Sequence, residues 1–167
     1  MGIVADRLAS TRIELSTPDG LVTGVLRSLD DVSFEFRDGS VRHYNERGLE
    51  RQLSNLLARL WTDYRQARFA AVAEATGRPA EPFKPWRANG RRYEAEREET
   101  VAEGMSTGHR VFVSTTGLRR WNVVIRDGSL SSVDETAFAA EVGSGYAAMV
   151  LDWRRKLRLL RAKHFPH

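Results

Sequence analysis

The chain of 167 residues contains no cysteine and only four histidines. It also has no apolar run approaching the ~20 residues of a membrane-spanning helix. The absence of cysteine excludes disulfide bonds and thiolate metal sites, and it fits a reducing compartment. The first residues lack the apolar core of a signal peptide. No Ser, His and Asp stand at a spacing typical of a catalytic triad. We therefore expect a cytoplasmic, non-enzymatic protein without a metal, a cofactor or a membrane partner.

One tetrapeptide, Arg-Asp-Gly-Ser, occurs twice, at residues 37–40 and 126–129, with an offset of 89 positions. At this offset the apolar positions agree without a gap from residues 32–65 to residues 121–154. Further upstream, the Ser/Thr-rich stretch at 16–21 resembles the one at 114–118, with a shorter connection in the second copy. The pattern predicts an internal duplication.

Each copy is predicted to form a strand, a tight turn, a second short strand and a long helix. Val32, Phe34 and Phe36 alternate with polar residues, which is the period of a half-buried strand. The Asp-Gly pair that follows favours a hairpin turn, because glycine adopts positive φ without steric cost. We expect the returning strands at residues 41–43 and 130–132. Asn and Asp at positions 45 and 134 are suitable helix N-caps.

Two long amphipathic patterns follow these caps, at residues 45–75 and 134–164. In the second, Gly143 and Gly145 each cost about 1 kcal/mol relative to alanine. We interpret them as a point of close packing where the two helices cross. Between the copies, residues 76–106 contain prolines and a stretch rich in arginine and glutamate, and the charges of the whole segment cancel.

These elements define an α+β fold with two tandem β-meander–helix units around a pseudo-two-fold axis. The sheet is expected to be antiparallel, with the two long helices packed against it. The predicted divisions are residues 1–75 for the first unit, 76–106 for a charged, proline-containing linker, and 107–167 for the second unit. An internal pseudo-dimer would complete the sheet within one chain, and a homodimer of the whole chain stays open.

The net charge of +4 has its source at the C-terminus. Residues 151–167 contain six basic residues and one acidic residue, so the other 150 residues together have a net charge of −1. Such a cluster can neutralise several phosphates. Cations at the end of a helix are also stabilised by the helix dipole, so a solvated face without a ligand is the alternative. The candidate residues for binding nucleic acid or another partner are Arg154, Arg155, Arg158, Arg161 and Lys163.

The pattern Pro-Asp-Gly-Leu-Val at 18–22, the glycine-containing turn, and Tyr44-Asn45-Glu46 ahead of a long helix resemble a known family. This is the β-meander and following helix of the YbaB/EbfC nucleoid-associated family. The pattern is similar also to YbaB-like accessory proteins of type VII secretion systems. The resemblance covers residues 10–70 and, more loosely, 108–164. The nucleoid proteins are small cytoplasmic homodimers that bind DNA with little sequence preference, and the secretion relatives are protein-binding helpers.

The resemblance implies a binding module for nucleic acid with little sequence preference. The alternative is a protein-binding adaptor or chaperone associated with a type VII secretion system. This chain departs from the family because the unit is duplicated and no clear long helix precedes the first sheet. No binding residue is carried over from the family, because no motif matches residue by residue.

Overall fold

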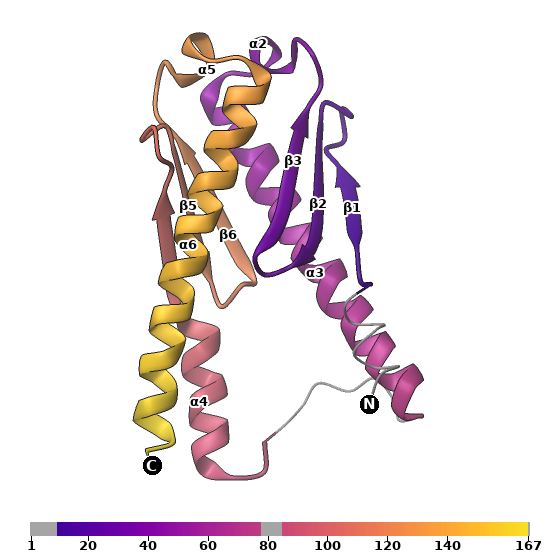
Figure 1. The fold of residues 1–167 in the computed structure, drawn as a ribbon, viewed down its shortest axis with the longest axis vertical. Helices are drawn as coiled ribbons and strands as arrows, with labels where there is room; N and C mark the ends of the chain where they lie inside the picture. The colour runs from indigo at the N-terminus through magenta and orange to yellow at the C-terminus, as the bar shows by residue number, and fades with distance from the viewer. Residues whose placement is uncertain (1–9, 78–84, 167) are drawn as a thin grey trace.

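The computed structural model of the chain describes residues 10–77 and 85–166 (Figure 1). The first half forms a three-stranded antiparallel sheet in the order β1-β2-β3, followed by a short helix and a long helix. The long helix begins after Asn45, whose side chain accepts the Gly48 N–H at 2.7 Å, and it ends at Gly77 in the left-handed conformation. The elements are β1 (Ile13–Ser16), β2 (Val22–Ser28), β3 (Asp31–Phe36), α2 (Ser40–His43) and α3 (Glu46–Thr76).

The second half repeats this order after an additional helix. Its elements are α4 (Ala88–Glu99), β4 (Val101–Met105), β5 (Val111–Thr116), β6 (Arg120–Ile125), α5 (Ser129–Ser132) and α6 (Glu135–His164). The stretch 76–106, which we expected to be a linker, therefore supplies both α4 and the edge strand β4. Composition concealed this strand because its two inward positions are Ala102 and Gly104, which add little apolar surface.

The register of both sheets follows the offset of 89. In the first sheet Leu15 pairs with Gly24, and Gly24 pairs with Phe34. The residues 89 positions later pair in the same way in the second sheet. Leu53 and Val142, which the duplication predicts to be equivalent core positions, are both fully buried. The α+β fold with two tandem β–helix units and packed long helices is confirmed, with two separate three-stranded sheets.

The turn between the first two strands of each unit also follows this offset. Thr17 N–H donates to the Val22 carbonyl at 2.9 Å, and Ser106 N–H donates to the Val111 carbonyl at 2.8 Å. Residues 17–20 thus correspond to 106–109, and the expected match of 16–21 with 114–118 is wrong. Ser, Thr and Gly are common to several turns of this chain, so composition alone matched the wrong one.

Neither Asp-Gly turn leads into a strand. Gly39 and Gly128 have φ values of 84° and 86°, as a tight turn requires, but α2 and α5 follow them. The predicted strands at 41–43 and 130–132 are therefore wrong. The edge of β6, where a returning strand would pair, is occupied by α3, because the Ser54 hydroxyl accepts the Val123 N–H at 2.9 Å. An outward N–H that already has a partner is not available to a fourth strand.

Each long helix packs on strands of its own sheet and against the last strand of the other unit. Helix α3 contacts β1, β2 and β6, and helix α6 contacts β4, β5 and β3 (Figure 1). Apolar side chains of both units form one continuous core. The ring of Trp121 stacks between those of Trp61 and Tyr146, with centroid separations of 5.9 and 6.0 Å. The two units therefore share one hydrophobic core.

Glycine permits close contact between α6 and its own sheet. A Cβ on Gly104 in β4 would lie 2.1 Å from the backbone nitrogen of Met149. A Cβ on Gly145 would lie 3.3 Å from the carbonyl oxygen of Val111, whereas one on Gly143 would have no such atom within 4 Å. The expected helix–helix crossing at Gly143 and Gly145 is therefore wrong, since Gly145 faces the sheet and Gly143 faces open space.

Candidate partner-binding groove on the last helix

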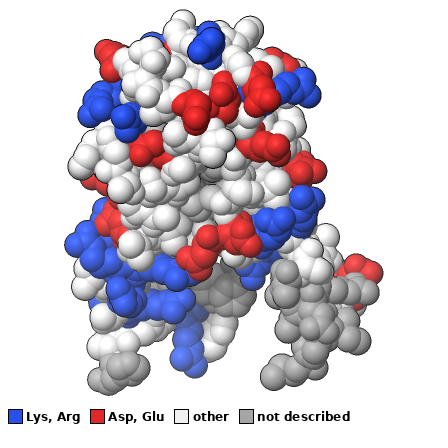
Figure 2. Space-filling view, turned by 45° about the horizontal axis from the view of Figure 1, so that its top comes forward, with Lys and Arg blue, Asp and Glu red and all other residues white. Residues whose placement is uncertain are grey.

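The five basic residues predicted from the sequence all lie on the C-terminal half of α6, and all are exposed. Figure 2 shows lysine and arginine gathered at the lower left of the molecule, where α6 ends and α4 begins, while the upper part mixes both signs. The structure thus brings the predicted cations together at one end of the molecule.

Most of these cations already have a partner. The partners are Asp30 for Arg154, Asp152 for Arg155, the Tyr93 hydroxyl for Arg161, and Glu96 for Lys163. Within residues 10–77 and 85–166, Arg158 has neither an ion pair nor a hydrogen bond. Residues distant in sequence, Asp30 and Glu96, therefore balance part of the charge excess that composition assigned to 151–167.

Asp152 fastens α6 to the edge of β4. Its carboxylate accepts the Glu103 N–H at 3.0 Å and lies 2.9 Å from Lys156 Nζ, which also donates to the Val101 carbonyl at 2.7 Å. Burial alone would raise the pKa of Asp152, but hydrogen bonds from Lys156, Glu103 N–H and Arg155 outweigh it and lower the pKa to about 2. Asp152 and Lys156 thus attach α6 to β4 and bind backbone groups at the edge of this strand.

A groove of about 550 Å³ lies beside α6, next to the turn between β2 and β3. The turn is held on α6 by the Tyr146 hydroxyl, which donates to the Leu29 carbonyl at 3.0 Å, and by the Arg154–Asp30 ion pair. Burial raises the pKa of Tyr146, so its hydroxyl remains a donor. The groove combines apolar and cationic side chains: Leu29, Leu151, Trp153 and Leu157 with Arg154, Arg158 and Arg161.

Sequence reasoning missed the apolar half of this groove. Leu29 comes from a turn 122 positions before Leu151, so no local pattern could place the two together. A signal was present at Leu151, which lies outside the apolar stripe of α6 and is 71% exposed. Leu159, two turns further along, is 66% exposed. A single exposed leucine is common on protein surfaces, so Leu151 becomes informative only because the fold places it in one groove with Leu29 and Leu157.

Helix α4 docks along the same part of α6, and the two run antiparallel (Figure 1). Tyr93 is buried, with its ring centroid 5.7 Å from that of Phe165, and its hydroxyl accepts a hydrogen bond from Arg161 Nε at 3.3 Å. Glu96 contacts Lys163 at 2.9 Å, and this contact lowers the pKa of Glu96. The C-terminal half of α6 therefore already binds one helix through an aromatic anchor and a carboxylate.

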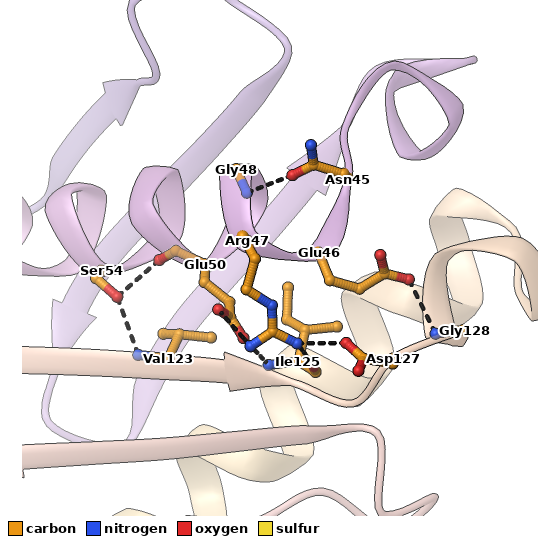
Figure 3. Close-up of polar contacts among 10 residues, drawn as sticks. All are labelled: Asn45, Glu46, Arg47, Gly48, Glu50, Ser54, Val123, Ile125, Asp127 and Gly128. Atoms are coloured by element: carbon orange, nitrogen blue, oxygen red, sulfur yellow. Dashed lines mark hydrogen bonds and ion pairs between the residues drawn. The ribbon is translucent and has the colours of Figure 1, made fainter.

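A second polar cluster joins α3 to β6 (Figure 3). Glu50 accepts the Ile125 N–H at 2.7 Å, and Arg47 donates to the Ile125 carbonyl at 3.1 Å and pairs with Asp127 at 2.5 Å. Together with the Ser54–Val123 bond, these contacts give partners to the Val123 N–H and to the N–H and carbonyl of Ile125 at the outer edge of β6.

The same region contains a reciprocal contact between the units. Glu46 accepts the Gly128 N–H at 3.1 Å, and the equivalent Glu135 accepts the Gly39 N–H at 3.0 Å. Because the groups of this cluster pair with one another, we assign it to holding the two units together and not to binding a ligand.

No protein-family model, curated protein or solved structure matches this chain. In the part of the chain that the structure describes, no helix is long and apolar enough to cross a membrane. The described residues also contain no group of three or more His, Asp or Glu side chains placed to hold a metal ion. The groove beside α6 is therefore defined as a candidate site by its geometry.

Proposed function

We propose that the chain is a non-enzymatic cytoplasmic adaptor that binds an acidic segment of another protein through the groove beside α6. The observation that carries this proposal is the mixed lining of the groove, where arginines lie next to leucines and a tryptophan. Arginine is enriched at the centres of protein–protein interfaces. Leu151 in the groove is 71% exposed, and covering it with a partner would remove apolar surface from water. The resemblance to YbaB-like secretion accessory proteins agrees with this proposal.

Nucleic acid is the second candidate partner, because Arg154, Arg158 and Arg161 share one exposed side of α6 at i, i+4 and i+7. Four of the six cations in residues 151–167 already contact a carboxylate, which reduces the number available to phosphates. Binding of this kind would tolerate any sequence and would weaken with salt, with a log–log slope of about −0.9 per phosphate neutralised.

Site-specific photo-crosslinking in living cells tests the proposed function. A benzoylphenylalanine is placed at Leu151, and as a control at Thr62, the equivalent exposed position on α3. We expect an adduct at 151 that protease digests and nuclease does not, with none at 62. Adding Arg158→Glu should abolish it.

The outcome separates the two candidates. An adduct at 151 that is sensitive to nuclease would support nucleic acid and overturn the protein proposal. The absence of an adduct at 151, or equal adducts at both positions, would show that the groove is not a docking site.

A further inference from the structure

We infer that the occupant of the groove is an amphipathic helix with acidic residues, which lies along α6 on the flank next to α4. This inference rests on the proposed function and names the class of segment that the adaptor would hold. Three features of the molecule lead to it: the way α4 is bound, the spacing of the arginines that have no carboxylate partner among the described residues, and the position of the leucines that line the groove.

Helix α4 shows how α6 already binds one helix of the same chain. Its sequence, ANGRRYEAEREE, contains four glutamates, three arginines and one buried aromatic residue, Tyr93. This residue packs at the end of α6, and Glu96 binds Lys163. The groove offers the same pair of features on the neighbouring flank of α6, with apolar lining for an anchor and arginines for carboxylates. A partner helix with an apolar anchor and carboxylates would therefore lie beside α6, on the flank next to α4, and form a three-helix arrangement with these two helices.

The arginines of the groove indicate a carboxylate as their ligand. Arg154 already holds one, from Asp30. Arg158 and Arg161 have no carboxylate partner within the described residues. They are three positions apart, which corresponds to a rise of about 4.5 Å along the helix. Carboxylates at i and i+3 of a helix have the same rise, whereas residues on one face of a strand are about 6.6 Å apart. The spacing therefore favours a helical occupant.

The leucines indicate where the apolar face of that helix would lie. Leu151 is in the groove lining and 71% exposed, and Leu157 and Leu29 form partly buried walls beside it. Trp153 is fully buried and forms the floor, so it supports the site without rearrangement. Apolar anchors on one face of a helix, flanked by charges that match the groove, are typical of helix-in-groove recognition.

Anisotropy titrations of the full chain with labelled synthetic peptides test the inference. The first probe is a helical peptide with leucines on one face and glutamates beside them. The second replaces every glutamate with glutamine. The third has the composition of the first, with its leucines at alternate positions so that it suits a strand. We expect only the first to bind well. Arg158→Gln should weaken its binding about tenfold, the loss expected for one charge-assisted hydrogen-bonded pair.

Arg51→Gln is the matched control variant, because it removes the same charge from an exposed position near the start of α3. It should leave peptide affinity unchanged. Equal binding of the glutamate and glutamine peptides, preference for the alternating peptide, or equal losses in the two variants would overturn the inference. The crosslink at 151 is read independently, so a protein adduct there without binding of the helical peptide would leave the adaptor function standing and reject its helical, acidic ligand.

Discussion

The two units have the same backbone plan and differ in their outward side chains. On the outer face of the first sheet, Ser16, Thr23 and Glu35 form a polar row across the three strands, with Ser16 Oγ and Thr23 Oγ1 2.9 Å apart. The equivalent row of the second sheet is apolar, and Met105 and Val124 in it are 46% and 38% exposed. Core positions fix the common plan, whereas positions facing solvent differ without altering it.

The two long helices also diverge where they leave the sheets. Arg158 and Arg161 on α6 correspond to Phe69 and Val72 on α3. In addition, α6 has α4 beside it and the groove along its flank. The proposed binding site therefore lies mainly on the second unit, and among the described residues of the first unit Leu29 lines it and Asp30 pairs with Arg154 at its rim. In a duplicated fold, one copy can thus serve mainly to stabilise the structure while the other carries the proposed binding site.

The sharpest test of this comparison asks whether the units can unfold separately. Val123→Asp places an unpaired charge in the shared core, where it should lower the free energy of unfolding by about 3–5 kcal/mol. Because the core is continuous, hydrogen exchange should accelerate equally in both units. Phe34→Asp, which places a charge in the same core from the first sheet, should also accelerate hydrogen exchange in both units.

Asn122→Asp, on the exposed face of the same strand, is the control and should leave stability nearly unchanged. If the first unit kept its protection in Val123→Asp, the two units would not share a core.

The sequence predicted what depends on local periodicity and capping. The alternation of Val32, Phe34 and Phe36 found β3, and the caps Asn45 and Asp134 found the starts of both long helices. It missed β4, whose inward residues Ala102 and Gly104 are too small to produce a period. The sequence also predicted strands where α2 and α5 lie. The contact of α3 with the β6 edge, which leaves no place for a returning strand, joins residues far apart in the chain and has no local sequence signal.

The candidate site was found only in part, for the same reason. The basic cluster on α6 is a local feature, and its location could be predicted. Its partners Asp30 and Glu96, and the groove wall at Leu29, come from other elements and become neighbours only in the folded chain. Charge counted along a sequence therefore overestimated the positive charge available to a ligand.

The next largest effect on stability is expected at a position where the second unit does not tolerate the side chain that the first unit has there. Gly104 corresponds to Leu15 of the first sheet, yet even an alanine Cβ at Gly104 would lie 2.1 Å from a backbone atom of α6. Gly104→Ala should therefore lower the free energy of unfolding by about 1–3 kcal/mol, measured in urea.

Gly143→Ala is the matched control, since a Cβ there meets open space. It should raise stability by about 0.5–1 kcal/mol through helix propensity. Similar losses in both variants would mean that α6 does not approach β4 as closely as described.

A smaller effect is expected from the contact between α3 and β6. Ser54→Ala removes the acceptor for the Val123 N–H and should cost about 1–2 kcal/mol, because a partly buried donor loses its partner. Thr62→Ala is the control. Among the described residues, the Thr62 hydroxyl bonds within its own helix, donating to the Ala58 carbonyl as Ser54 does to Glu50 and accepting from Arg65 at 3.4 Å. Equal costs for both would show that the strand contact contributes nothing. Gly143 occupies the position equivalent to Ser54, so Gly143→Ser should be tolerated.

The smallest effect is a dependence of stability on pH that arises where α6 is fastened to β4. The pKa of Asp152 is about 2 in the folded chain, below its ordinary value of 3.8. The unfolded chain therefore binds more protons between these values, and the contribution of Asp152 is complete above pH 3.8 and lost as the pH falls toward 2. After allowance for solvent screening, this contribution to the free energy of unfolding amounts to roughly 1 kcal/mol.

Asp152→Asn should thus be less stable than wild type at pH 5, and the difference should vanish near pH 2. Asp63→Asn removes the same charge at the equivalent position of α3, where the described residues show no contact with a strand edge, so it should change little at pH 5. A difference for Asp152→Asn that persisted unchanged to pH 2 would mean that the carboxylate charge does not fasten α6 to β4.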